Sequence, residues 1–289
     1  MRLGVALSGG GAKGIAHAGV LKALQDSNIE ISAIGGTSSG AFIACMYALG
    51  YSPEEMYEIF KIYSKEMVEE EKKGKIGKIN KIFNFKSTGF RKGENIEKIF
   101  NRLSEQKGIK NISQIQTLPI SIPAVDIKDG KEYIFTNNIS SDAKVYKKYI
   151  TDIPIGKALR ASSSFPALFC PCDFKEHKFL DGGALNNIPV LEVKRQGVDK
   201  VLAINFKADD ITNSSNYMDI AMRTIDLMGN KISEKNLKMS DYVITLELEK
   251  MGLLEINKLE KCYEQGYYQT INKINEIKEI IEWSQHKIS

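Results

Sequence analysis

The first residue whose type and setting could do chemistry is Ser38. It lies at the centre of Gly36-Thr37-Ser38-Ser39-Gly40, which matches the G-x-S-x-G pattern of a nucleophile elbow. An apolar run at residues 29–34 predicts a strand directly before it, and residues 39–49 predict a helix directly after it. The helix N-terminus would lower the cost of negative charge on the serine oxygen. A turn whose serine only caps the helix is the alternative interpretation.

A glycine-rich loop at residues 8–14 is the second candidate. It reads Ser-Gly-Gly-Gly-Ala-Lys-Gly, and it follows the predicted strand Leu3–Leu7 and opens a predicted helix at residues 12–24. Free N–H groups and the positive end of the helix dipole at such a loop favour an anion. The anion could be a phosphate, or the oxyanion of an acyl-transfer intermediate.

The same loop leaves a second function class open. Gly9, Gly11 and Gly14 satisfy the G-x-G-x-x-G dinucleotide fingerprint, so an oxidoreductase that binds a dinucleotide is an alternative. Dinucleotide-binding domains with that fingerprint normally have an acidic residue at the end of the second strand, which binds the ribose. Here that strand ends in Gly35-Gly36, which weakens the dinucleotide interpretation.

Asp181 is the third candidate, because it ends a short predicted strand and is followed by Gly182 and Gly183. Taken alone, an ordinary turn aspartate is the simpler interpretation. An unperturbed aspartate, with a pKa of about 3.9, is a weak base at neutral pH. Partial burial beside Ser38 would raise that pKa and allow Asp181 to accept the serine proton directly.

Three histidines compete with Asp181 for the role of base. We expect His17 to be packed in the first helix, His177 to be solvated in a polar turn, and His286 to lie in a polar tail. A Ser38–Asp181–His286 triad would have the chain order of the α/β-hydrolases. That fold normally places several strands before its elbow, whereas one precedes it here.

The elements around these residues predict an α/β fold. Strand, helix, strand and helix follow one another within the first fifty residues, which is typical of a parallel sheet covered by helices. Residues 53–115 predict a charged, mainly helical insertion, and Asp129-Gly130 predicts a hairpin turn. Residues 256–283 predict a C-terminal helix that Gly266 would interrupt. We expect residues 1–289 to form one domain.

Taken together, the three motifs resemble the patatin-like phospholipase family. That family combines an N-terminal glycine-rich loop, a G-x-S-x-G elbow and an Asp-Gly-Gly or Asp-Gly-Ala element. Residues 161–169, Ala-Ser-Ser-Ser-Phe-Pro-Ala-Leu-Phe, are similar to its Ala-Ser-x-x-x-Pro-x-x-Phe segment, and Asn187-Ile188-Pro189-Val190 is similar to the stretch after its aspartate. Phe165 is a departure, since we expect a smaller residue there, and it leaves the acyl length in doubt.

The resemblance implies a three-layer α/β/α fold with a central, mostly parallel sheet, and hydrolysis of lipid acyl esters through an acyl-enzyme intermediate. It implies a Ser–Asp dyad without histidine and activity that is independent of calcium. We expect no cofactor and no metal. By residue-by-residue carry-over, Ser38 is the nucleophile and Asp181 the proton acceptor. The backbone expected to form the oxyanion hole is that of Gly9, Gly10, Gly11 and Ala12. The supporting motif positions are Gly14, Gly36, Gly40, Gly182 and Gly183. A non-catalytic relative that serves as an interaction protein is the remaining alternative.

Composition limits the partners. The formal net charge is +4, from 40 Lys and Arg against 36 Asp and Glu, so charge alone predicts no nucleic-acid partner. No apolar run is long enough to span a bilayer or to form a signal-peptide core. We therefore expect a cytoplasmic protein with reduced cysteines. Eight basic and no acidic residues between 72 and 92, interleaved with Ile and Phe, predict either a solvated lid or a peripheral contact with an anionic membrane.

Overall fold

The computed structural model describes residues 1–77, 93–139, 148–166, 168–207, 217–249 and 256–282, and only the backbone of 66–77, 217–226 and 230. The strands are β1 (Leu3–Leu7), β2 (Ile31–Gly36), β3 (Ile120–Asp126), β4 (Lys131–Thr136), β5 (Tyr149–Ile150), β6 (Cys172–Phe174), β7 (His177–Asp181), β8 (Lys200–Phe206) and β9 (Tyr242–Leu246). The α-helices are α1 (Ala16–Asp26), α2 (Ser39–Ala48), α3 (Pro53–Gly77), α4 (Glu94–Gln106), α5 (Ile155–Ser162), α6 (Val190–Lys194), α7 (Tyr217–Lys238), α8 (Leu259–Ile271) and α9 (Ile274–Glu282). Short 3-10 helices are η1 (Gly11–Ile15), η3 (Ile112–Gln114) and η5 (Gly182–Ala184).

These strands form one mixed sheet in the order β5-β4-β3-β2-β1-β8-β9, with β7 also paired to β3 and β6 paired to β7. The central strands β3, β2, β1, β8 and β9 run parallel. β4 and β7 pair with β3 in antiparallel fashion. The chain leaves β1 toward β2 on one side and returns to β8 on the other. Ligands of open α/β sheets bind at such a switch point, beyond the carboxyl ends of the strands.

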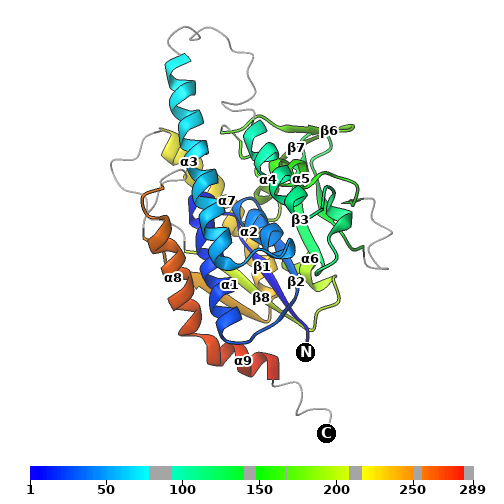
Figure 1. Ribbon diagram of the computed structural model, residues 1–289, viewed down its shortest axis with the longest axis vertical. Coiled ribbons are helices and arrows are strands. Elements are labelled where there is room, and N and C mark those ends of the chain that lie inside the picture. Colours follow the sequence, from blue (N-terminus) through cyan, green and yellow to red (C-terminus); the bar gives the residue numbers. More distant parts are fainter. Residues whose placement is uncertain (78–92, 140–147, 167, 208–216, 250–255, 283–289) are drawn as a thin grey trace.

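Successive side chains along each strand point to opposite faces of the sheet, and each face has its own hydrophobic core. Val5 and Leu7 of β1 join a large cluster with α1, α2, α3, α5 and α8 on one face. Ala6 between them joins a smaller cluster with Val190 and Val193 of α6 and with Leu237 of α7 on the other face. The sheet therefore lies between two helical layers (Figure 1), which confirms the predicted three-layer α/β/α fold with a mostly parallel sheet.

Several boundaries differ from the sequence-based expectations. The predicted helix at 12–24 divides into η1 and α1. The predicted strand at 29–34 extends to Gly36, because Gly35 and Gly36 pair with Ala6 and Leu7 of β1. The predicted hairpin after Asp129-Gly130 is confirmed as β3 and β4.

Gly266 does not interrupt the C-terminal helix, so that expectation was wrong. α8 continues through Gly266, and the break between α8 and α9 follows Ile271. A Cβ on Gly266 would overlap the carbonyl of Ala16 in α1. The glycine therefore marks a close helix–helix approach, which periodicity within one helix could not reveal.

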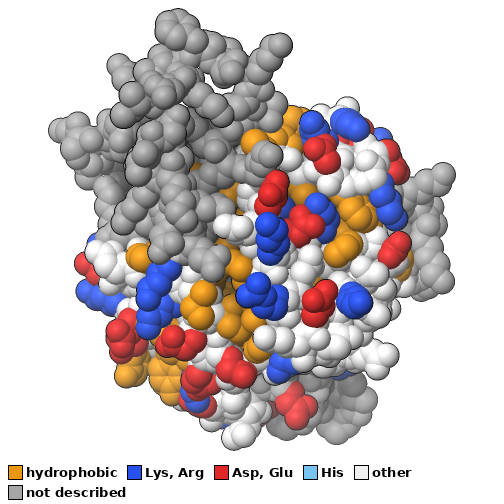
Figure 2. All heavy atoms as spheres, turned by 45° about the horizontal axis from the view of Figure 1, so that its top comes forward, with side chains coloured by type: hydrophobic (Ala, Val, Ile, Leu, Met, Phe, Trp, Pro, Cys, Tyr) orange, Lys and Arg blue, Asp and Glu red, His pale blue; other side chains and the backbone are white. Residues whose placement is uncertain are grey.

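The structure also shows how far the cysteines are buried and how charges are distributed on one face. Cys45, Cys172 and Cys262 are buried, and Cys170 is partly buried. On the face seen in Figure 2, basic and acidic side chains are interspersed, so this face carries no broad field of one sign. Among the described residues, no helix combines the length and the apolar character that crossing a bilayer requires.

Candidate active site

Ser38 lies in the tight turn between β2 and α2. Its backbone has φ 53° and ψ −120°, a conformation that residues with a Cβ rarely adopt. A Cβ on Gly36 would overlap the Gly40 carbonyl, and a Cβ on Gly40 would lie 2.6 Å from the carbonyl oxygen of Ser8. The two motif glycines therefore let the elbow pack against the end of β1, while the backbone strain falls on the serine.

Asp181 reaches the same level of the sheet from a distant part of the chain. Gly35 of β2 pairs with Ser121 of parallel β3, and Asp181 of β7 pairs with Ala124 of β3. Ser38 and Ala124 each lie three residues beyond the pair Gly35–Ser121. The register therefore brings the candidate nucleophile and the candidate base to one edge of the sheet.

The carboxyl of Asp181 is buried, with the residue 3% exposed. Its Oδ1 accepts a hydrogen bond of 2.8 Å from the N–H of Gly183. Burial raises the pKa of this carboxyl from 3.8 to about 6, although the bonds from Gly183 and from the Ser38 hydroxyl act in the opposite direction. A carboxyl with this pKa is ionised at neutral pH and is a much better proton acceptor than a solvated aspartate.

The contact between Ser38 and Asp181 is loose. Ser38 is close enough to lower the pKa of Asp181, yet Oδ2 of Asp181 is buried without a hydrogen bond of ordinary length and angle among the described residues. Catalytic hydrogen bonds are often long or poorly aligned before substrate binds. One carboxylate oxygen thus keeps an unused lone pair at the candidate site.

The glycine loop passes beside the serine. A Cβ on Gly9 would lie 3.2 Å from the Cβ of Ser38. The N–H of Gly9 already donates to the backbone oxygen of Asn187 at 3.2 Å and to its Oδ1 at 3.1 Å. The first N–H groups of a helix have no acceptor within it, so Gly10, Gly11 and Ala12 at the start of η1 are better candidates for oxyanion donors than Gly9.

The remaining motif glycines allow close packing around this loop and the aspartate. A Cβ on Gly14 would overlap the side chain of Ser39, and a Cβ on Gly182 would overlap the carbonyl of Pro123. Gly183 supplies the N–H that holds Oδ1 of Asp181. These small residues therefore fix how closely the three motifs approach one another.

The described histidines are both engaged elsewhere. His17 is fully buried, as expected, and its Nε2 lies 2.8 Å from the carbonyl oxygen of Ser8. His177 is not solvated as expected: its Nδ1 lies 2.7 Å from Oδ2 of Asp126, and its ring stacks on Phe179. The expectation was wrong because the sequence of residues 175–178 looks like an exposed polar turn. In the fold, His177 begins β7, and the pairing of β7 with β3 brings Asp126 next to it. His286 lies outside the described residues, as does the basic segment 78–92.

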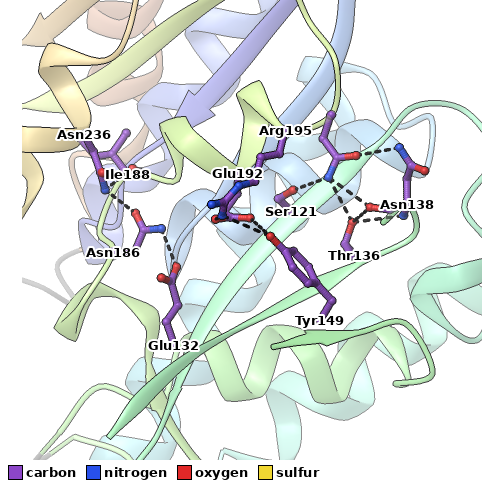
Figure 3. A network of polar contacts seen from close by, with 11 residues as sticks. Ser121, Glu132, Thr136, Asn138, Tyr149, Asn186, Ile188, Glu192, Arg195 and Asn236 are labelled. Carbon is purple, nitrogen blue, oxygen red and sulfur yellow. Dashed lines mark hydrogen bonds and ion pairs between the residues drawn. The ribbon is translucent and has the colours of Figure 1, made fainter. Parts of the chain in front are cut away.

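Sequence reasoning missed the polar residues that hold the elbow from behind. The Thr37 hydroxyl donates to the Asn186 carbonyl at 2.8 Å, and the Ser38 N–H donates to Oγ of Ser162 at 3.1 Å. Figure 3 shows the Asn186 side chain between Glu132 of β4 and Asn236 of α7. Thr37 and Ser162 lie inside segments that the sequence analysis singled out, whereas Asn186 and Glu132 lie outside them, and none of the four was assigned this role.

A nearby ionic cluster stabilises the same region. Glu192 of α6 is buried, and it accepts hydrogen bonds from Tyr149 and Arg195 (Figure 3). Burial raises the pKa of Glu132, and the negative charge of Glu192 adds to that shift. Among the described residues, no group of three or more His, Cys, Asp and Glu side chains is arranged to hold a metal ion.

Comparison with known proteins gives this geometry a family. The model of the patatin-like phospholipases matches residues 5–194. Lysophospholipase NTE1 of Yarrowia lipolytica is 28% identical over 75% of this chain and 14% of its own length. Lysophospholipase nte1 of Emericella nidulans is 30% identical over 75% of this chain and 13% of its own length. The chain thus spans a small part of these curated relatives.

Solved structures share the fold at low sequence identity. VipD from Legionella pneumophila superposes with a TM-score of 0.50 at 16% identity, over 95% of this chain and 67% of its own. Human GIVD cytosolic phospholipase A2 superposes with a TM-score of 0.50 at 9% identity, over 97% of this chain and 60% of its own. Since the family model covers most of the chain and all three motifs, this protein belongs to the patatin-like phospholipase family.

Proposed function

We propose that this protein hydrolyses fatty acyl ester bonds of lipids through a Ser38–Asp181 dyad. The observation that carries the proposal is the buried Asp181 carboxyl near Ser38: burial raises its pKa to about 6, against the opposite effects of the hydrogen bonds from Gly183 and Ser38. The strained conformation of Ser38 supports its role as nucleophile. Membership of the family supports the substrate class.

In the proposed reaction, Oγ of Ser38 attacks the ester carbonyl carbon and its proton passes to Asp181. N–H groups of Gly10, Gly11 and Ala12 stabilise the oxyanion of the tetrahedral intermediate. When this intermediate collapses, the alcohol leaves with the proton from Asp181, and the acyl group stays on Ser38. Water then attacks the acyl carbonyl and gives a proton to Asp181; when the second tetrahedral intermediate collapses, the fatty acid leaves and Oγ of Ser38 takes that proton back, which restores the serine hydroxyl and the ionised carboxylate.

Lysophospholipids are the first substrates to test, because two similar proteins are named lysophospholipases. p-Nitrophenyl esters of increasing chain length would test the acyl specificity. Phe165 is half-buried and follows Ser164, whose carbonyl accepts the N–H of Asp181. We propose that Phe165 limits acyl length, so that Phe165→Ala shifts the preference toward longer chains.

The decisive experiment compares Ser38→Ala and Asp181→Asn with the wild type. We expect both variants to lose at least about 1,000-fold in kcat while keeping their circular dichroism spectra. His286→Ala should retain activity, and an inactive but folded His286→Ala would support the α/β-hydrolase triad instead. If wild-type protein hydrolyses none of these esters, the non-catalytic interaction protein becomes the better description, and fluorescence titration with NAD tests the dinucleotide alternative.

We also propose peripheral contact with an anionic membrane. Three exposed apolar side chains on α7 support it: Leu227, Met228 and Ile232 are 51%, 61% and 37% exposed. Gly229 lies among them and contacts the turn after Asp181, since a Cβ there would be 3.5 Å from the Gly183 carbonyl oxygen. The backbone of α7 therefore reaches the turn that follows Asp181. A cytoplasmic location and a single domain over residues 1–289 are part of this proposal.

A further inference from the structure

The peptide group between Ser8 and Gly9 is held from both ends. Its carbonyl oxygen lies 2.8 Å from Nε2 of His17. Its N–H donates to the backbone oxygen and to the Oδ1 of Asn187. A peptide group is planar, so fixing both of its polar atoms fixes the orientation of the whole plane. The next N–H along the chain is that of Gly10, the first candidate oxyanion donor.

The surroundings of His17 determine which of its two ring nitrogens carries the hydrogen. Because the Ser8 carbonyl can only accept, Nε2 must carry the hydrogen, and Nδ1 is then an acceptor. Nδ1 is buried with no hydrogen-bond partner among the described residues. Burial also lowers the pKa of His17 to about 4, so the ring stays neutral at the pH where Asp181 is ionised.

Packing holds the imidazole ring in place. His17 is fully buried near the start of α1, and its ring centroid lies 4.7 Å from that of Phe206 at the end of β8. The Phe206 ring occupies the space into which a Cβ of Gly10 would project, 2.5 Å away. His17, Phe206 and Gly10 thus form one packed unit directly beneath the loop.

We propose that His17 is a positioning residue: as a neutral Nε2–H donor it orients the Ser8–Gly9 peptide and thereby directs the Gly10 N–H toward the developing oxyanion. This inference rests on the proposed function, since it assigns a task within the same site. His17 does not exchange a proton with Ser38 in this role. A buried histidine that only filled space would need no donor at Nε2, so removing the donor separates the two roles.

The test compares His17→Phe, which keeps the ring volume without a donor, with His17→Gln, whose side-chain amide can donate near the position of Nε2. We expect His17→Phe to lower kcat for a soluble p-nitrophenyl ester roughly 10- to 100-fold with KM nearly unchanged, because misdirecting an oxyanion donor weakens transition-state binding. His17→Gln should recover most of that loss. Ile277→Ala, a buried truncation on α9, controls for lost stability and should leave kcat unchanged.

Nitrogen-15 NMR of the imidazole provides a readout that does not depend on turnover. We expect His17 to show the neutral Nε2–H tautomer from pH 5 to pH 8. A Ser38-dependent wild type whose His17→Phe variant keeps full kcat, or an Nδ1–H tautomer, would overturn this inference and leave the proposed function intact. A wild type without esterase activity would overturn the proposed function instead.

Discussion

At the scale of single residues, the candidate site is held at an energetic cost. Ser38 has a positive φ that costs of order 1–3 kcal/mol for a residue with a Cβ. Asp181 is an ionisable group 3% exposed, and burial disfavours its charged form. Neither feature helps the chain to fold. Their presence at the same edge of the sheet is better explained by chemistry than by stability.

The raised pKa of Asp181 predicts that Asp181→Asn stabilises the protein while abolishing its activity. The folded pKa of about 6 exceeds the ordinary 3.8, so the neutral carboxyl contributes stability that is present below pH 3.8 and is lost as the pH rises toward 6. The loss reaches about 3 kcal/mol above pH 6. Asparagine carries no such charge and keeps an Oδ1 acceptor for Gly183.

Urea unfolding of both proteins at several pH values measures this effect. The stability advantage of Asp181→Asn should grow between pH 4 and pH 6 and stay constant above that range. An advantage that is absent at pH 8, or equal at pH 4 and pH 8, would contradict the burial of a titrating Asp181.

The same carboxyl predicts the pH dependence of catalysis. Asp181 acts as a base only when ionised, so kcat/KM should fall about tenfold per pH unit below an apparent pKa near 6 and should be level above it. His17 contributes nothing to this limb above pH 5, because burial lowers its pKa to about 4. Initial rates with a soluble ester from pH 4.5 to pH 9 test this profile, and a limb centred above pH 7 would argue for a different base.

At the scale of elements, α8 packs closely against α1. A Cβ on Gly19 would overlap the carbonyl of Tyr263, and a Cβ on Gly266 would overlap that of Ala16. Glycines on both helices thus bring the two backbones into contact. His17 is the residue after Ala16, so this contact lies at the same turn of α1 as the ring beneath the glycine loop.

This packing predicts that Gly266→Ala is destabilising, although alanine favours helix formation by about 1 kcal/mol over glycine. The added methyl group must force α8 away from α1, and overpacking of this kind typically costs about 1–3 kcal/mol. Glu264→Ala, an exposed position on the same helix, is the matched control and should change little. Thermal unfolding of the three proteins decides the matter: an unchanged or higher Tm for Gly266→Ala would contradict the close approach.

At the scale of the whole molecule, the sheet brings the three candidate motifs to one end. The glycine loop follows β1, the elbow follows β2, and Asp181 ends β7, which reaches that level by pairing with β3. Leu227, Met228 and Ile232 lie exposed on α7, and Gly229 of the same helix lies near the turn that follows Asp181. Lys231 and Lys235 lie exposed on the same helix, and Lys231 pairs with the exposed Glu234 at 2.7 Å, so any attraction of α7 to an anionic lipid surface would rest mainly on Lys235.

Membrane contact through α7 predicts a selective loss of vesicle binding. We expect a triple variant, Leu227→Ser with Met228→Ser and Ile232→Ser, to bind vesicles of phosphatidylglycerol and phosphatidylcholine about tenfold more weakly. Hydrolysis of a soluble ester should be unchanged. Tyr268→Ser, which removes an apolar side chain 61% exposed on α8, is the control. Equal vesicle binding by all three proteins in a sedimentation assay would contradict a role of α7 at the membrane.

The sequence by itself determined those features that depend on near neighbours along the chain. The elbow around Ser38, the loop at residues 8–14 and the main strands were predictable, because turn chemistry and apolar periodicity act over a few residues. The tertiary structure decided which groups meet. Asp181 lies level with Ser38, the Gly9 N–H donates its hydrogen bonds to Asn187, and His177 pairs with Asp126. These outcomes depend on strand register and on burial, and both are set by atoms from segments more than fifty residues apart.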